Sequence, residues 1–214
     1  MSSENTTRAR LTETAARLFH EQGYEATGVA TILREAGVNS GSLYHFFPSK
    51  EDLLAAVLDR YVEKLRPEIL ERAEQASVDP IERVFALLGV YRKGLEITHC
   101  SLGCPIGNLA LEVGDGSPRL REKIAQNFEN WRRAVEEWLE VASDRFPAAL
   151  DTADLSRFVL VVMEGAVMQA RALRSLDPFD AAVRQLRRYF DSLLAERSAK
   201  SSKNRNNEKG RKKN

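Results

Sequence analysis

The segment from residue 38 to residue 50 concentrates side chains that can hydrogen-bond to nucleic acid. Four of its residues carry groups that can reach base edges in a DNA groove: Asn39, Ser40, Ser42 and His45. Tyr44 and Lys50 can donate to phosphate oxygens, and Gly41 would let the backbone approach a duplex closely. These residue types also suit plainer roles. Tyr44 would then be a surface aromatic, Lys50 a solvated lysine, and Asn39 or Ser40 a helix cap. The surrounding helices decide between these interpretations.

Residues 27–54 read as a helix, a tight turn and a second short helix. Thr27 is predicted to cap the first helix, whose apolar positions recur at spacings of three and four, and Gly37 to end it in the left-handed conformation. Ser40 is predicted to cap the second helix, with Leu43 facing inward. A helix this short is stabilised by packing across the turn against the helix before it, which is the helix-turn-helix arrangement.

This stretch resembles the N-terminal domain of the TetR/AcrR family of bacterial transcription regulators, from residue 8 to about residue 60. The residues that carry the resemblance are Ala15, Leu18, Phe19, Gly23, Tyr24, Thr27, Ile32, Ala36, Gly37, Val38, Gly41, Leu43, Tyr44, Phe47, Lys50, Glu51 and Leu53. One departure is that His45 comes one place earlier than the family's usual histidine. The resemblance implies that Thr27, Tyr44 and Lys50 contact phosphate, and that the protein binds a double-stranded DNA operator as a homodimer.

The composition and the positions of glycine and proline favour an all-α chain. Its 214 residues, 43% of them apolar, suffice for one or two domains with a buried core. Glycine and proline lie mostly between periodic segments, and alternating apolar runs are few. We expect about nine helices, with a three-helix helix-turn-helix DNA-binding domain in residues 1–50. A C-terminal helical bundle for effector binding and dimerisation is expected in residues 51–197.

Charge is distributed unevenly along the chain. Residues 198–214 carry a net charge of +6, so residues 1–197 carry −5 within a total of +1. DNA binding must therefore depend on locally placed donors rather than on bulk charge. The basic tail lacks apolar periodicity and is predicted to be disordered, either as a solvated terminus or as an electrostatic clamp on phosphates.

Several function classes find no support in the sequence. No apolar run approaches the roughly 20 residues that cross a membrane, and two cysteines are no disulfide framework. The sequence therefore predicts a soluble, cytoplasmic protein without membrane contact. No serine–histidine–acid set, metal-ligand spacing or phosphate-binding glycine loop occurs, so we predict no enzymatic activity, no metal and no cofactor.

The last two predicted helices, residues 151–176 and 178–198, are apolar over wide faces. An internal bundle and self-association are both compatible with such faces. In the family, the last two helices pair with those of a second copy as a four-helix bundle, so the resemblance implies a homodimer. A two-fold dimer places two reading helices in successive major grooves, which predicts a palindromic operator.

A mixture of aromatic side chains and few polar groups in the C-terminal body indicates a site for a small, largely apolar effector. The candidate lining is Phe85, Leu88, Tyr91, Leu95, Cys104, Asn108, Trp131, Trp138, Phe158, Met163, Glu164 and Gln169. Residues identified by periodicity alone are equally compatible with plain core. Glu164 interrupts an apolar run, so it must face Arg157 or Arg171, or bond a group in a cavity.

Cys104 lies before Pro105 at a break between helices, near His99. A helix start and a nearby histidine can lower the pKa of a thiol, which would suit an electrophile sensor. The alternative is a small buried residue of the core.

These features predict a ligand-responsive transcriptional regulator, most commonly a repressor in this family, that is released from a palindromic operator by its effector. Three alternatives remain at this stage. They are a DNA-binding protein with a purely structural C-terminal bundle, a helical small-molecule carrier, and a thiol-based sensor acting through Cys104.

Overall fold

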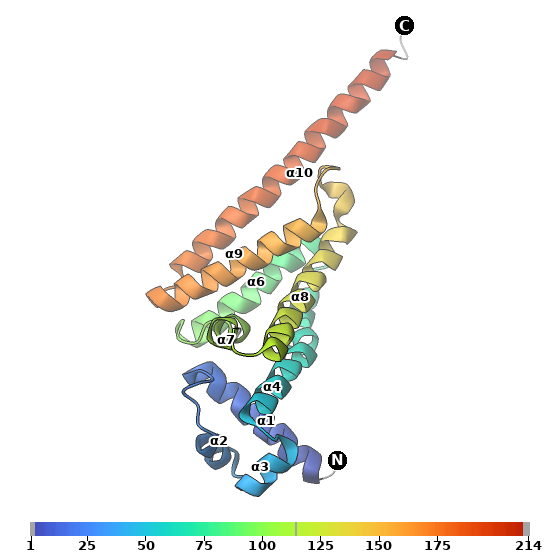
Figure 1. Cartoon of the computed structure of the whole chain (residues 1–214). Helices are drawn as coiled ribbons and strands as arrows, with labels where there is room; N and C mark the ends of the chain where they lie inside the picture. The colour runs from blue at the N-terminus through green and yellow to red at the C-terminus, as the bar shows by residue number, and fades with distance from the viewer. Residues whose placement is uncertain (1–2, 114, 212–214) are drawn as a thin grey trace.

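The computed structural model describes residues 3–113 and 115–211, which form helices and connecting turns without a β-strand. The helices are α1 (Ser3–Gln22), α2 (Val29–Ala36), α3 (Ser40–Phe46), α4 (Lys50–Lys64), η1 (Leu65–Leu70), α5 (Glu71–Ala76), α6 (Pro80–Ile97), α7 (Pro105–Val113), α8 (Pro118–Val141), η2 (Ser143–Arg145), α9 (Thr152–Leu173) and α10 (Asp177–Arg211). The segments α4, η1 and α5 follow one another without a break, so they count as one rod. The described chain then has nine α-helical rods, and the predicted all-α fold is confirmed. Figure 1 shows α1, α2 and α3 at one end and α10 extending past the body at the other.

The turn after α2 forms as predicted, but the cap before α2 does not. Gly37 ends α2 in the left-handed region, with φ at +61°. Gly28 occupies the N-cap position that was predicted for Thr27. Thr27 is fully buried, and its hydroxyl lies within hydrogen-bonding distance of the carbonyl oxygens of Gly23 and Leu18, at 2.6 and 3.3 Å. The prediction was wrong because this hydroxyl closes the preceding turn instead.

α3 is capped by Asn39 and not by Ser40, the predicted cap. The Asn39 Oδ1 accepts a hydrogen bond from the Ser42 backbone N–H at 2.8 Å. This bond satisfies one of the N–H groups that a helix start leaves without an intrahelical partner. Leu43 and Phe47 are buried in the core that α3 shares with α1 and α2, as a helix of this length requires.

The continuous helical rod α4–η1–α5 contains one π-helical segment, Leu65–Leu70. Pro67 lies within this segment and has no N–H group to donate. A proline inside a helix interrupts the regular hydrogen-bond ladder, and a π-helical turn is one way in which a helix accommodates such an interruption. The rod therefore continues past Pro67 to Ala76 instead of ending there.

α10 continues through the basic segment to Arg211, where the sequence predicted a disordered tail from residue 198. That prediction is corrected for residues 198–211. No proline follows Pro178 in the chain, and extending an existing helix costs far less free energy than starting one. Residues 212–214 of the predicted tail lie outside the described residues.

Two hydrophobic cores hold the helices together. One joins α6, α8, α9 and α10 and contains both tryptophans, Trp131 and Trp138. The other joins α1, α2 and α3 to the first half of α4. This second core also includes four residues from the C-terminal body: Leu109, Val113, Leu120 and Ile124. The division at residue 50 therefore remains a proposed division of roles, since the packing runs across it.

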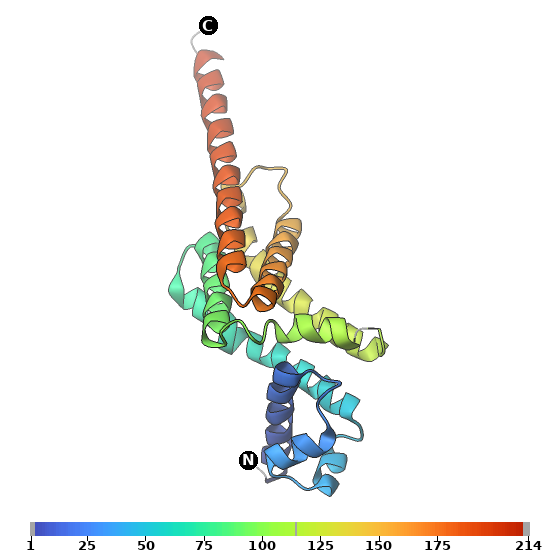
Figure 2. The same ribbon diagram turned by 90° about the vertical axis from the view of Figure 1, so that its left-hand side faces the viewer.

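One apolar surface of α9 and α10 is left uncovered within the chain. It consists of Phe158, Val161, Met168 and Tyr189, which are between 42% and 68% exposed. The rings of Phe158 and Tyr189 meet edge to face, with their centroids 5.5 Å apart, and Figure 2 shows the two helices side by side. Contiguous exposed apolar side chains of this kind mark interaction surfaces. In residues 3–113 and 115–211, no helix has the length and apolar character needed to cross a bilayer.

Candidate DNA-reading surface and ligand cavity

α3 and its N-cap present most of the predicted DNA-contacting residues to solvent. The exposed ones are Asn39, Ser40, Gly41, Tyr44 and His45. Ser42 is half-buried, while Tyr44 exposes 55% of its surface even though it is aromatic. Thr27 is the exception, because its buried hydroxyl is already engaged within the protein. The structure thus gathers the predicted reading residues on one surface and removes Thr27 from it.

Lys50 is held beside this surface by the turn that follows α1. Its Nζ lies 4.3 Å from the centre of the Tyr24 ring and 3.5 Å from the carbonyl oxygen of Glu25. Both interactions are weak and leave the ammonium half-buried at the start of α4. Lys50 is therefore positioned near α3 with donors to spare for a phosphate.

Three arginines close to the reading surface were missed by the sequence analysis. Arg10 donates to the Gly37 carbonyl oxygen at 3.5 Å, and Arg8 lies 5.2 Å from the centre of the Phe47 ring. Arg34 on α2 is exposed. These guanidinium groups supply local positive charge that the net negative charge of the body conceals. The proximity of Arg8 and Arg10 to the motif depends on how α1 packs, which local sequence patterns do not reveal.

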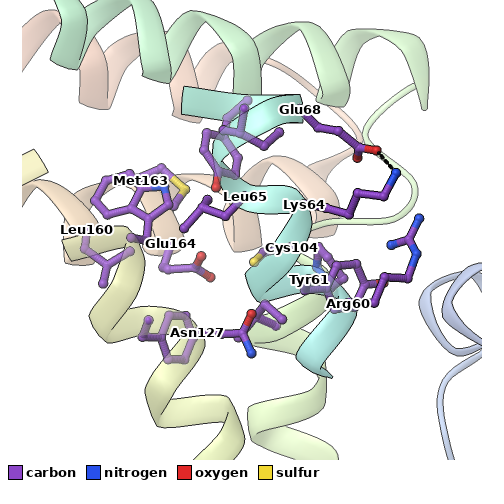
Figure 3. Close-up of a pocket in the computed structure, with 16 residues that line it drawn as sticks. Arg60, Tyr61, Lys64, Leu65, Glu68, Cys104, Asn127, Leu160, Met163 and Glu164 are labelled. Carbon is purple, nitrogen blue, oxygen red and sulfur yellow. Dashed lines mark hydrogen bonds and ion pairs between the residues drawn. The ribbon is translucent and has the colours of Figure 1, made fainter. Parts of the chain in front are cut away.

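A cavity of about 210 Å³ lies where α4, η1, α6, α7, α8 and α9 converge (Figure 3). Five predicted ligand-binding residues line it: Tyr91, Cys104, Trp131, Met163 and Glu164. The lining residues that sequence reasoning missed are Arg60, Tyr61, Lys64, Leu65, Glu68, Ile69, Pro105, Ile106, Asn127, Phe128 and Leu160. Six of these belong to α4 and η1, a rod that the sequence presented only as a link between domains. Its apolar stripe predicted burial without indicating a cavity.

The other seven predicted lining residues lie outside this cavity: Phe85, Leu88, Leu95, Asn108, Trp138, Phe158 and Gln169. The first two and Trp138 pack in the hydrophobic core. Leu95 and Asn108 line neighbouring cavities. Phe158 and Gln169 are exposed on α9. Helical periodicity identifies an apolar face but not what that face packs against, and this is why the predicted set differs from the lining of this cavity.

Glu164 extends from α9 into the cavity beside Cys104, as Figure 3 shows. Gly107 makes room for it, since a Cβ atom at position 107 would lie only 2.5 Å from Glu164 Oε2. Burial raises the pKa of the Glu164 carboxyl, and a hydrogen bond with the Cys104 thiol opposes that shift in part. The cavity therefore combines an apolar wall with the Glu164 carboxyl, while its other acid, Glu68, pairs with Lys64.

The environment of Cys104 contradicts the predicted activation of its thiol. Burial, followed by the negative charge of Glu164, raises the pKa of Cys104 well above its usual value. A hydrogen bond from the Gly107 N–H to the sulfur, at 3.4 Å, opposes the rise only in part. The thiolate is the reactive form of cysteine, so a thiol held protonated is a poor nucleophile. His99, the predicted activating group, is exposed.

α7 connects the cavity to the DNA-reading domain. Its first turn follows Cys104, and its last turn carries Glu112. The two carboxylate oxygens of Glu112 accept hydrogen bonds from the backbone N–H groups of Tyr24 and Glu25, at 2.9 and 2.6 Å. These two residues also hold Lys50, as described above. A displacement of α7 would therefore be transmitted directly to the turn beside the reading surface.

A second contact joins the same two parts of the molecule. His20, near the end of α1, makes a hydrogen bond at 3.0 Å between its Nε2 and the carbonyl oxygen of Gly103. Desolvation by burial lowers the pKa of His20, which favours the neutral ring. Sequence reasoning missed both His20 and Glu112. Their partners lie more than 80 residues away along the chain, so no local pattern could identify them.

An exposed polar helix after a glycine turn, carried by a helical body with a cavity, defines a helix-turn-helix transcription regulator. Comparison with known families agrees with this class. Residues 11–57 match the bacterial regulatory proteins of the tetR family, and residues 80–186 match the tetracyclin repressor-like C-terminal domain. The chain belongs to the TetR family of transcription regulators, which are not enzymes.

The relatives match over most of their length. The HTH-type transcriptional repressor DhaR of Mycobacterium sp. strain GP1 is 31% identical, over 81% of this chain and 86% of its own. The HTH-type transcriptional regulator LmrA of Bacillus subtilis is 31% identical, over 80% and 89%. The crystal structure of a TetR transcriptional regulator from Chloroflexus aurantiacus is 32% identical, covers 89% of this chain and 97% of that one, and has a TM-score of 0.76.

Replacing Glu112 with alanine is expected to loosen the turn after α1. The amides of Tyr24 and Glu25 would lose a charged acceptor, so their hydrogen exchange should accelerate by about tenfold. Residue-resolved exchange measured by NMR checks this, with Glu122→Ala, an exposed change on α8, as the control. Unchanged rates at Tyr24 and Glu25 would show that Glu112 does not hold the turn.

Proposed function

We propose that this protein is a ligand-responsive repressor in the cytoplasm, which binds a palindromic operator as a homodimer and is released by a small, largely apolar effector. The observation that carries the proposal is that the cavity is walled by α4 and by residues at the start of α7, the two elements that also hold the DNA-reading domain. Repression is favoured because the relative DhaR is named a repressor.

The DNA step uses groups of two kinds. Tyr44 and Lys50, with the nearby arginines, supply donors for phosphates, which position the protein without reading sequence. Asn39, Ser40 and His45, exposed at the start of α3 and along it, can reach base edges in the major groove, and Gly41 allows close approach. Ser42 adds a partly buried hydroxyl. One helix of seven residues reads few base pairs, which favours two copies on a two-fold operator.

The release step is a shift between two populations of the dimer. In one state the spacing of the two reading helices fits the operator, and in the other it does not. An effector that binds more tightly to the second state lowers operator affinity, by at most the ratio of its own affinities for the two states. In this chain, occupancy of the cavity can act on α4 through Tyr61, on η1 through Leu65, and on α7 next to Cys104. α4 begins at the reading domain and α7 ends in contact with it, so movement of either helix would alter the position of α3.

The competing functions make different predictions for the same experiment. A purely structural C-terminal bundle would bind the operator with an affinity that no cavity ligand changes. A sensor acting through Cys104 would lose its response in Cys104→Ser. The raised pKa of this thiol argues against such a sensor. The operator can be found by capturing genomic fragments on the purified protein. Titration of that operator with and without candidate ligands then tests the proposal.

Removing a phosphate donor is expected to weaken DNA binding without changing sequence preference. Lys50→Ala should lower operator affinity by about three- to tenfold and reduce the slope of log affinity against log salt by about 1, because one fewer counterion is released. Tyr44→Phe should weaken binding in the same sense, whereas His45→Ala should alter preference among operator variants. Gel-shift titrations at two salt concentrations measure these effects, with Lys93→Ala on α6 as the control. Wild-type affinity in both the Lys50 and Tyr44 variants would contradict the assignment.

A charge on the uncovered surface of α9 and α10 is expected to separate the dimer. Val161 is 68% exposed in the single chain, so Val161→Glu should leave the fold intact while placing a carboxylate in an apolar seam. Light scattering should show a dimer for the wild type and a monomer for the variant, which should also lose tight operator binding. Val78→Glu, a change at a 92% exposed residue between α5 and α6, is the matched control. A dimeric Val161→Glu variant would place the seam elsewhere.

A further inference from the structure

Glu164 is an acidic group in the cavity without a cationic partner among the described residues. The two arginines that sequence reasoning offered as partners are engaged elsewhere. Arg157 pairs with Asp154, and Arg171 donates to Asn108 at 2.7 Å. A carboxylate shielded from water without a compensating charge is unfavourable, so a cation bound beside Glu164 would be stabilised.

The cations at the edge of the cavity do not meet this requirement. Arg60 forms a two-pronged ion pair with Glu13 of α1, and Lys64 pairs with Glu68 at 2.6 Å. Figure 3 shows Arg60, Lys64 and Glu68 on the side of the cavity away from Glu164, whose carboxylate points toward Cys104. Each cation near the cavity is thus already matched by an acid of its own.

The other walls suit a positively charged ligand. Tyr61, Tyr91, Phe128 and Trp131 surround the cavity with aromatic rings, and Tyr91 meets Trp131 edge to face at 6.3 Å between centroids. The faces of aromatic rings attract cations, most strongly where water is excluded. These rings therefore add to the attraction that the Glu164 carboxylate exerts on a positively charged group.

We propose that the effector is a small organic cation, with an ammonium or similar charged group placed against Glu164 and an apolar body held by the aromatic walls. This inference rests on the proposed function and narrows its largely apolar effector to one with a positive charge. Gly107 is required for this site, because the absence of a side chain at position 107 lets the Glu164 carboxylate reach the cavity. An anionic effector would face Glu164 without compensation.

The test uses two molecules of the same shape that differ in charge, the phenyltrimethylammonium cation and neutral tert-butylbenzene. Binding to the full-length protein is followed by equilibrium dialysis and by intrinsic fluorescence, to which both tryptophans contribute and of which Trp131 lines the cavity. We expect the wild type to bind the cation at least about tenfold more tightly than the neutral molecule, as expected for a charged contact. In Glu164→Gln, which keeps the side-chain shape, this ratio should fall to about one while affinity for the neutral molecule is unchanged.

Matched controls separate charge from folding. Glu140→Gln, at an exposed residue of α8, should keep the wild-type ratio, and thermal melting establishes that all variants fold. A wild type that shows no preference for the cation, or a preference that survives in Glu164→Gln, overturns the inference. Operator release is measured separately. Cation binding that depends on Glu164 but does not release the operator would support the ligand class and contradict the proposed effector role. Operator release by the neutral molecule alone would support a role for the cavity in release and contradict the cationic ligand class.

Discussion

The first half of α4 is buried in the core of the reading domain, while its second half lines the cavity, and the rest of the structure depends on this double packing. Leu54, Val57 and Leu58 are fully buried in the core that also contains residues of α1, α2, α3, α7 and α8. Burying one such side chain contributes roughly 1.5–3 kcal/mol, so the reading domain cannot pivot freely on α4 and should move with it. Because α7 reaches the same core through Leu109 and Val113, the cavity and the reading surface are joined along two separate rods.

Local signals predicted the elements well where the physics is local. Gly37 ended α2 as expected, because only a left-handed residue closes that turn. The caps of α2 and α3 were each misplaced by one residue. Burial withdrew Thr27 from the start of α2, whereas Asn39 and Ser40 are both exposed and are residue types that cap helices about equally well. The basic tail was predicted from composition alone, which does not capture how readily α10 continues once formed.

The cavity was predicted far less completely than the reading surface. On α3, exposure follows from the helix period once Leu43 is placed inside. In the body, by contrast, Phe158 and Met163 are both apolar residues of α9, yet one is exposed and the other lines the cavity. Which face of α9 turns inward depends on α6 and α8. The contact of Glu164 with Gly107, on which the chemistry of the cavity depends, joins segments that are 57 residues apart.

Hydrogen exchange of the free and operator-bound protein tests most directly whether the cavity and the reading domain are structurally coupled. If α7 and the rod of α4 and η1 transmit the state of the reading domain, operator binding should slow exchange in α2 and α3 and also in residues 105–113 and 61–70, which adjoin the cavity. If protection is confined to the reading domain and exchange around the cavity is the same with and without operator, the proposed coupling is contradicted.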